Sequence, residues 1–127
     1  MKLPTLQDIL DLHTHSIERF GGESGVLNEE QLQSFLPQLQ QAIFYQNKTK
    51  LDIAAWILCR LVQNHYFVDG NKRVGLGTAL TFLKVNNCTW NLPDPDFFYT
   101  LTLEIAANEG DDILPLVEEK LSEVIIC

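Results

Sequence analysis

A nine-residue run at positions 65–73, HYFVDGNKR, gathers several kinds of reactive side chain. It contains an imidazole, a carboxylate, an amide and two cations, at His65, Asp69, Asn71, Lys72 and Arg73. Because an imidazole titrates at about pH 6.5, His65 is suited to accept a proton from an attacking hydroxyl near neutral pH. Mg²⁺ commonly binds one carboxylate together with substrate phosphates and waters, which predicts Asp69 as a metal ligand. The run therefore indicates proton transfer beside a bound phosphate.

The same run predicts an anion site at the start of a helix. We expect a helix to begin near Asn71, where unpaired backbone N–H groups and the positive end of the helix dipole favour negative charge. Gly70 allows the backbone to approach an anion closely. Lys72 and Arg73 would lie in the first turn, where cations are unfavourable by roughly a few tenths of a kcal/mol unless a polyanion is bound. These features predict a phosphate-binding loop.

A structural interpretation fits the same spacing. In it, His65 ends a buried helix, residues 69–71 cap the next helix, and Lys72 and Arg73 are solvated surface cations. Neither the residue types nor their spacing separates this interpretation from the catalytic one.

Other reactive side chains are less suited to a site. His13 and His15 are two residues apart on a predicted helix and therefore point to different faces, so they are not expected to share a metal. Cys59 stands among apolar residues and is expected in the core rather than as a nucleophile. The aromatic run at residues 97–99, FFY, is also expected in the core.

Two long helices are predicted to hold the loop. Apolar residues occupy so much of the segment 51–67 that it predicts a central, buried helix. After Gly70 the apolar residues return with helical spacing over residues 74–83 and stop before Asn86 and Asn87, which predicts a second central helix.

Shorter helices are expected around this pair. Residues 6–20 show helical spacing before two glycines, and Asn28 is a suitable N-cap for a short helix that Pro37 ends. Residues 37–50 fit either extended chain or irregular helix. Two more helices are predicted, one through about residue 107 and one that starts at residues 111–112. The predicted fold class is therefore all-α.

Composition restricts the kind of protein. The 127 residues suffice for one hydrophobic core, so residues 1–127 are predicted to form a single domain. A net charge of −8 argues against direct nucleic-acid binding. No apolar stretch approaches the roughly 18 residues of a membrane span and the N-terminus lacks a signal-peptide pattern, so a cytoplasmic protein is expected. The cysteines form no CxxC pair and are expected to be reduced thiols.

The residues around the loop resemble a known family. Residues 64–83, NHYFVDGNKRVGLGTALTFL, are similar to the Fic superfamily motif HxFxDGN, followed by Gly or Lys and then Arg. Lys72 stands where AMP-transferring Fic proteins usually have Gly, and Leu76 where they usually have a second Arg; both choices resemble the Doc branch. Residues 13–36 are also similar to the HxxxIxRYGGxxGVRD stretch of Doc proteins, and the similarity extends over essentially the whole chain.

This resemblance implies a Fic/Doc-type helical bundle and the toxin of a toxin–antitoxin system. It implies transfer of a phosphoryl group from ATP to a hydroxyl of a protein, with translation elongation factor Tu as the expected target and arrest of translation as the result. By the matched positions, His65 would be the base and Asp69 the Mg²⁺ ligand. The phosphates of ATP would be held by Gly70, Asn71, Lys72 and Arg73.

The chain departs from the family pattern at several positions. Tyr66 replaces a usual Pro, while Leu27 and Asn28 replace a usual Arg and Asp, which weakens any role of that region in catalysis. Some Fic proteins carry an inhibitory motif that begins with Ser or Thr, but Ile105 occupies the corresponding position here. The resemblance therefore implies a separate antitoxin, whose disordered segment folds on this protein as an amphipathic helix in a hydrophobic groove.

Two other functions stay open at this point. An AMP transferase would use the same loop, but the target hydroxyl would attack the α-phosphate of ATP instead of the γ-phosphate. A binding protein would keep the fold without catalysis. Lys72 and Leu76 favour phosphoryl transfer over AMP transfer.

Overall fold

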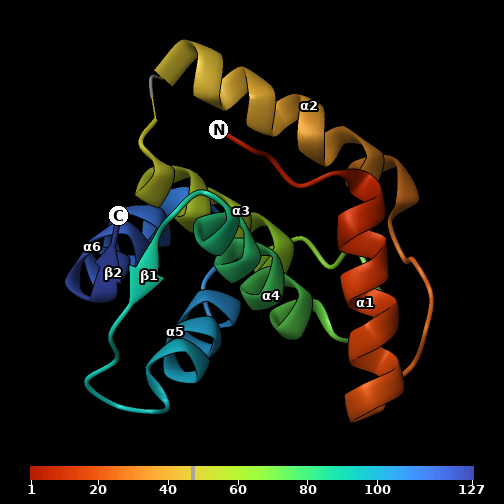
Figure 1. Ribbon diagram of the computed structural model, residues 1–127. Coiled ribbons are helices and arrows are strands. Elements are labelled where there is room, and N and C mark those ends of the chain that lie inside the picture. The colour runs from red at the N-terminus through yellow and green to blue at the C-terminus, as the bar shows by residue number, and fades with distance from the viewer. Residues whose placement is uncertain (47) are drawn as a thin grey trace.

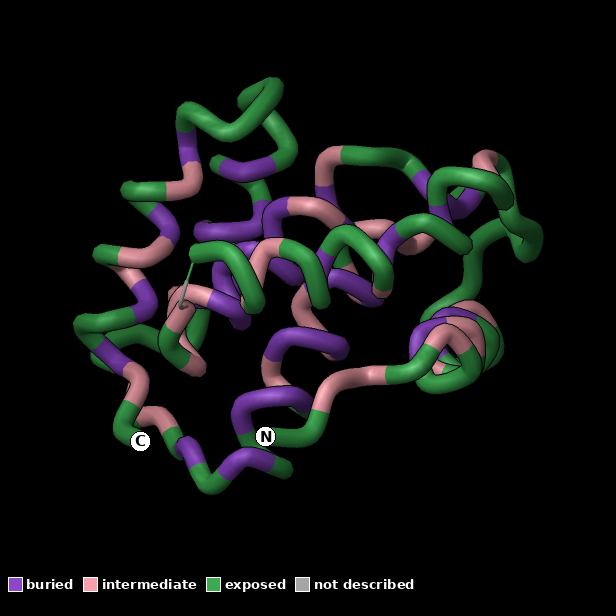
Figure 2. Tube along the Cα trace, turned by 90° about the horizontal axis from the view of Figure 1, so that it is seen from above, coloured by how far each residue is buried: buried purple, intermediate pink, exposed green. Residues whose placement is uncertain are grey.

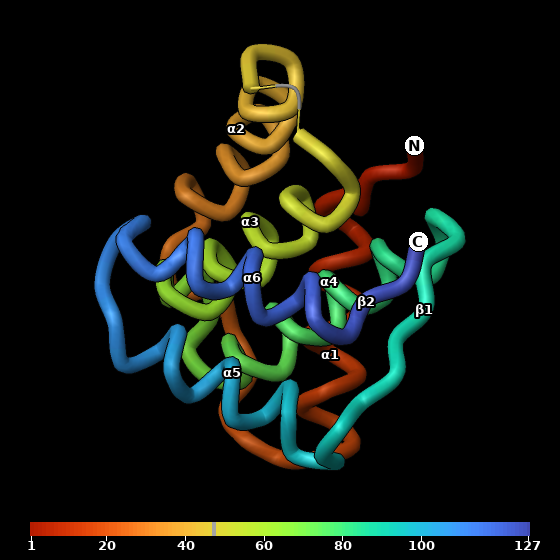
Figure 3. Tube along the Cα trace, turned by 90° about the vertical axis from the view of Figure 1, so that its left-hand side faces the viewer, coloured from red at the N-terminus to blue at the C-terminus, as the bar shows by residue number. Residues whose placement is uncertain are grey.

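A computed structural model describes residues 1–46 and 48–127 and confirms the predicted all-α class. Helices α3 and α4 cross the centre of the molecule, and the other helices surround them (Figure 1). Figure 3 shows α6 lying across α3, against which it packs. The elements are α1 (Leu6–Phe20), α2 (Glu29–Gln46), α3 (Lys50–Gln63), α4 (Asn71–Val85), β1 (Thr89–Trp90), α5 (Phe97–Ala106), the 3-10 turn η1 (Asp111–Ile113), α6 (Leu114–Val124) and β2 (Ile125–Ile126).

The core is built around α3, as its apolar composition predicts. The residues of α3 from Ile53 to Cys59 are buried, and buried stretches of the surrounding helices gather toward the centre (Figure 2). Each fully buried Leu, Ile or Phe side chain contributes roughly 1.5–3 kcal/mol. A Cβ atom on Gly75 would lie 2.8 Å from Val62 Cγ2, so glycine permits the close approach of α4 to α3. No helix in the described part of the chain is long and apolar enough to cross a membrane.

Local capping fixes where two helices begin. The Thr5 side chain accepts a hydrogen bond from the Asp8 N–H at 3.1 Å, while the Asp8 carboxylate accepts one from the Thr5 N–H at 2.9 Å. Thr49 and Asp52 make the same reciprocal pair at the start of α3. Such a pair satisfies two helix-end groups and is worth about 1 kcal/mol. These local pairs specify where α1 and α3 begin, independently of tertiary packing.

Two predicted helix boundaries are wrong. Helix α2 does not end at Pro37 but continues to Gln46, because Leu32, Phe35 and Leu39 stay buried along one side and their packing outweighs the proline penalty. The sequence fits either extended chain or irregular helix over residues 37–50, and the structure shows helix as far as Gln46. Position 47 lies outside the described residues. The central helix ends at Gln63 rather than at residue 67, so the chain leaves α3 before His65.

The prediction of three reduced cysteines is also wrong. Strands β1 and β2 pair antiparallel with Thr89 opposite Ile126, and this register puts Cys88 opposite Cys127, where the two form a disulfide. A separation of 39 residues and two strands of only two residues each left no local pattern from which the pair could be predicted. Cys59 remains a buried free thiol, as expected.

Candidate active site

The predicted loop connects α3 to α4, and its backbone is unusual at both ends. His65 has a φ angle of +49°, in the left-handed region that few residues other than glycine adopt, and its side chain is exposed. Gly70 has a φ angle of +81° and directly precedes α4. Helix α4 begins at Asn71, as predicted. The first N–H groups of α4 therefore have no partner within the helix and lie beside the turn at Asp69 and Gly70.

Asn71 organises the loop from within. Its side-chain Oδ1 accepts a hydrogen bond from the Phe67 N–H at 3.1 Å, and its Nδ2 donates to the Phe67 carbonyl at 2.9 Å. Both functions of the amide are thus used on one backbone residue. The sequence predicted Asn71 as a phosphate contact; its side chain instead closes the loop, and its contribution to an anion site would come from the backbone N–H at the helix start.

The segment 21–28, GGESGVLN, lies along the loop and is called the cradle segment below. Val26 pairs with Phe67 in an isolated antiparallel bridge, and the Val68 N–H donates to the Gly25 carbonyl at 3.1 Å. Closer to His65, the N–H groups of Leu27 and Asn28 both donate to the Tyr66 carbonyl, at 2.8 and 3.1 Å. The loop is therefore held mostly by backbone groups that lie far from it in sequence.

Asn28 precedes α2, as its predicted N-cap position requires, and its carbonyl accepts a hydrogen bond from the Leu32 N–H at 3.0 Å. Its side chain has a second part that the sequence did not suggest. The Nδ2 donates to the His65 carbonyl at 2.9 Å, so the side chain holds the backbone of the predicted base. The contact could not be foreseen because it joins residues 37 positions apart.

Asp69 presents an ionised carboxylate. Its Oδ1 accepts a hydrogen bond from the Gly70 N–H at 2.8 Å, and its Oδ2 accepts one from the Glu23 N–H at 3.2 Å. These two backbone donors, with a smaller contribution from the Arg73 charge, lower the pKa of Asp69 below its usual 3.8. A Cβ atom on Gly22 would lie 2.6 Å from Oδ2, so the cradle segment has no room there for a side chain.

The surroundings of Asp69 fit Mg²⁺ better than a cation held by protein ligands alone. No cluster of three or more His, Cys, Asp or Glu side chains suited to a metal occurs among the described residues. Mg²⁺ needs only one or two carboxylates when phosphate oxygens and waters complete its shell. Each Asp69 oxygen accepts one backbone hydrogen bond and keeps further lone pairs for such an ion.

A pocket of about 300 Å³ opens beside the start of α4. This volume is at the lower end for ligand sites. The Arg73 Nη2 donates to the Gly21 carbonyl at 3.0 Å and its guanidinium lies 5.6 Å from the centre of the Phe20 ring, so this cation is held in place, whereas Lys72 is exposed. The pocket is lined by Asp69, Gly70, Asn71, Lys72, Arg73, Leu76, Tyr99, Thr102 and Leu103.

The structure brings most of the predicted site residues together, but not all of them. Residues 69–73 share the pocket, whereas His65 is exposed at the other end of the loop and outside the pocket lining. Tyr99 was expected in the core but is 62% exposed and lines the pocket from α5. Phe98 is buried, as expected, because neighbouring residues of a helix point to different sides.

His13 contacts the loop from α1 and was not singled out as a site residue. Its Nε2 lies 2.8 Å from the Asp69 carbonyl oxygen, which can only accept, so this nitrogen carries the hydrogen. The imidazole stacks on the Phe67 ring with centroids 3.9 Å apart and only 5% of the residue is exposed. The sequence signal for this contact was that His13 lies on the apolar side of the predicted helix, with Ile9 and Ile17, where a histidine must find a partner inside the fold.

His13 and His15 face different surroundings, as their spacing predicts, and His15 is exposed on α1. Burial raises the pKa of the Cys59 thiol to about 12, with a smaller contribution from the Asp111 charge, so it is a thiol at neutral pH.

The part of the chain that holds α1 and the loop is similar to known proteins. Residues 3–83 match the Fic/DOC family, and the chain belongs to that family. It is 31% identical over 81 residues to the protein named "Protein kinase doc" of Escherichia phage P1. The aligned residues make up 63% of this chain and 64% of the phage protein. The family match spans α1, the cradle segment and the loop, and it confirms the resemblance based on the motif.

Proposed function

We propose that this chain is a Doc-like protein kinase that transfers a phosphoryl group from Mg²⁺-bound ATP to a hydroxyl of a protein. The observation that carries the proposal is the pocket at the start of α4, where an ionised carboxylate, two cations and backbone N–H groups meet. The similarity to a protein named as a kinase supports the same reaction.

Each residue has a defined part in the proposed reaction. Lys72, Arg73 and the N–H groups at the start of α4 bind the phosphates and neutralise charge on the transferred group. Asp69 binds Mg²⁺, which when present adds further neutralisation of the phosphate oxygens. His65 takes the proton of the target hydroxyl as its oxygen forms a bond to the γ-phosphorus and the bond from that phosphorus to ADP breaks.

An AMP transferase is the second candidate function, because the same proposed phosphate pocket could present either the α- or the γ-phosphorus of ATP to His65. Lys72 and Leu76 both line the pocket, which supports their predicted influence on that choice. A lysine at position 72 adds bulk and a cation that suit a terminal phosphate, and Leu76 supplies no second guanidinium for an α-phosphate.

The test compares ATP labelled at the α or the γ position, with Mg²⁺ and candidate protein targets. Wild type should transfer only the γ-label, Lys72→Gly should transfer less, and the double variant Lys72→Gly, Leu76→Arg shows whether AMP transfer emerges. Transfer of only the α-label by wild type would replace the kinase by an AMP transferase. A folded wild type that binds ATP and transfers neither label to any protein of a cell extract would favour a non-catalytic binding protein.

For the target we propose translation elongation factor Tu, so that its modification arrests translation. The support is the resemblance to Doc proteins. Purified factor should acquire one label that is lost when its acceptor hydroxyl residue, located by mass spectrometry, is replaced. A translation extract should stop making protein only in the presence of active chain and ATP.

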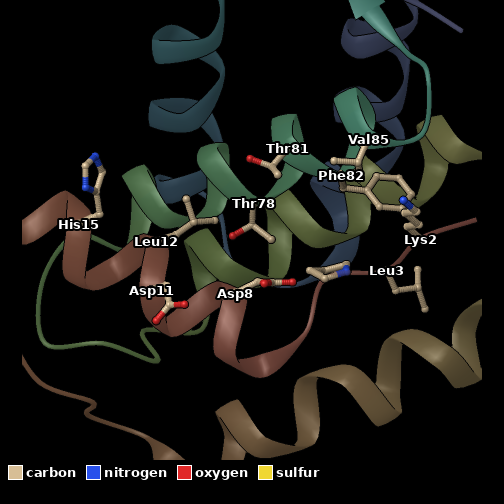
Figure 4. A pocket seen from close by; sticks show the side chains of 11 residues that line it. Lys2, Leu3, Asp8, Asp11, Leu12, His15, Thr78, Thr81, Phe82 and Val85 are labelled. Atoms are coloured by element: carbon tan, nitrogen blue, oxygen red, sulfur yellow. The ribbon is translucent and has the colours of Figure 1, made fainter.

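For the regulatory partner we propose an antitoxin whose disordered segment folds as an amphipathic helix between α1 and α4. A groove of about 540 Å³ lies there, with Leu12 from α1 and Phe82 and Val85 from α4 among its walls (Figure 4). Asp8 and Asp11 line the same groove, which favours a basic residue in the partner. Ile105 has an aliphatic side chain and is fully buried, so the hydroxyl of the inhibitory motif is absent at this position.

A pair of surface variants tests the groove. Thr81 lines the groove, whereas Thr100 is another exposed threonine, on α5 and outside the groove. Thr81→Arg should weaken binding of the small protein encoded beside this chain at least tenfold in calorimetry, and Thr100→Arg should not. Equal affinity of both variants would place the antitoxin elsewhere, and failure of that protein to bind wild type would remove the proposal of an antitoxin.

A further inference from the structure

The α1 residue His13 forms a direct connection between a helix outside the motif and the carboxylate residue of the loop. We infer that His13 is a positioning residue, whose Nε2–H fixes the Asp69 peptide and thereby orients both the Asp69 carboxylate and the first N–H groups of α4. The inference rests on the proposed function, because it assigns His13 a part in binding the metal-associated nucleotide.

The contact is directional and tightly packed. The Nε2 to Asp69 oxygen distance is 2.8 Å, within the range of a good hydrogen bond. The ring is nearly parallel to Phe67, with an interplanar angle of 10°, so its plane is fixed as well as its position. His13 Cδ2 also lies 3.7 Å from where a Cβ atom of Gly70 would be, so the ring packs against the glycine that precedes α4.

This contact completes the restraint of Asp69 from opposite sides. The carboxylate is held by the N–H groups of Gly70 and Glu23, and the carbonyl is held by His13. Rotation of the peptide between Asp69 and Gly70 would move the carbonyl and the Gly70 N–H together. His13 therefore opposes the one rotation that would turn the Gly70 N–H away from the carboxylate.

The volume of His13 does not explain this contact. A phenylalanine would fill nearly the same space and could stack on Phe67, but it has no N–H to donate. The contact is only partly buried and is a single hydrogen bond, so its loss should still leave a folded chain. The orientation of the loop would nevertheless lose its fixed donor. The functional and the structural contributions of His13 are therefore separable by experiment.

The experiment compares His13→Phe with His13→Gln, which keeps an N–H donor, and with Gln7→Phe, an exposed control on the same helix. Binding of ATP is titrated against Mg²⁺ by calorimetry, and thermal unfolding shows that each variant is folded. Hydrogen exchange of loop residues 65–73 is measured in the absence of nucleotide. His13→Leu, which also lacks the donor, replaces His13→Phe if the larger ring prevents folding.

We expect His13→Phe to weaken Mg²⁺-dependent ATP binding by about 10- to 100-fold, the usual effect of losing a group that orients a metal ligand. Loop amides should exchange up to about tenfold faster, as loss of one hydrogen bond supports. His13→Gln should recover part of the ATP affinity and part of the protection from exchange, and Gln7→Phe should match wild type. Unchanged Mg²⁺ dependence and loop exchange in His13→Phe, or equal losses in His13→Gln, would overturn the inference.

Failure of the proposed function gives a different result. Wild type would then show no Mg²⁺-dependent ATP binding at all. The exchange measurement needs neither metal nor nucleotide, so it would still show whether His13 fixes the loop.

Discussion

His65 combines an exposed side chain with a backbone held in the left-handed region. The Asn28 side chain and the neighbouring Tyr66 carbonyl contacts hold this backbone, so the imidazole itself is not needed to fold the loop. We expect His65→Ala to lose about 10²- to 10⁴-fold in phosphoryl transfer, as for removal of a general base, while ATP binding and thermal stability stay unchanged. Single-turnover transfer of γ-label checks this, with His15→Ala as the exposed control. Wild-type rates in His65→Ala would rule out the base assignment.

Asp69 leads to a prediction about pH. The pKa of Asp69 is lower in the folded chain than its usual 3.8, so the ionised carboxylate stabilises the folded state. This stabilisation is fully present above the usual pKa and is lost as the pH falls through the lower pKa of the folded state. Asp69 should therefore remain ionised throughout the neutral range. Mg²⁺-dependent ATP binding should show no titration of this group between about pH 5 and 8.

The matching variant is Asp69→Asn, which keeps the shape and removes the charge. It should weaken Mg²⁺-dependent ATP binding at every pH in that range, without altering binding measured in excess chelator. Metal dependence equal to wild type would show that another group binds the ion.

At the scale of elements, the cradle segment is as important to the loop as α3 and α4. Gly22 and Gly21 provide a matched pair, because both have positive φ angles, +113° and +82°, but only at Gly22 would a Cβ meet Asp69. Both alanine variants should lose about 1 kcal/mol of folding stability through backbone strain. Only Gly22→Ala should also displace the carboxylate.

The measurement is Mg²⁺-dependent ATP binding by the two alanine variants, with denaturant unfolding to compare their stability. Gly22→Ala should bind at least tenfold more weakly than Gly21→Ala, on the scale seen when a metal ligand is misplaced. Similar binding by both variants would mean that the cradle segment moves freely and does not position Asp69.

At the scale of the whole molecule, the Cys88–Cys127 disulfide ties the end of the chain to the strand that follows α4. The crosslink closes a loop of 39 residues that includes α5, one wall of the proposed phosphate pocket. Chain-entropy arguments give such a loop about 3–4 kcal/mol of stabilisation. Cys127→Ser should lose about that much in denaturant unfolding, and a reducing agent should destabilise wild type but not the variant. Equal stability of oxidised wild type and Cys127→Ser would contradict the predicted stabilisation by the disulfide.

Helix α1 contributes to both predicted sites. Asp8, Asp11, Leu12 and His15 line the proposed antitoxin groove, whereas His13 contacts the loop. A partner bound in the groove would therefore touch the helix that holds Asp69.

The prediction that residues 1–127 form a single domain remains a prediction.

The sequence by itself determined the chemistry of the loop and the helices on both sides of it. Composition marked α3 as buried, and the change from loop residues to helical spacing placed the start of α4 at Asn71. These features depend on residues within a few positions of one another, where backbone geometry and apolar periodicity decide the outcome. The motif also indicated the family.

Only the tertiary structure decided what holds the loop and what surrounds it. His13 and Asp69 are 56 residues apart, Asn28 and His65 are 37 apart, and Cys88 and Cys127 are 39 apart. Tyr99 lines the proposed phosphate pocket because α5 packs beside α4, and Pro37 stays helical because its neighbours are buried. Such contacts depend on how complete helices pack, and helix packing is determined by the whole core rather than by any short stretch of sequence.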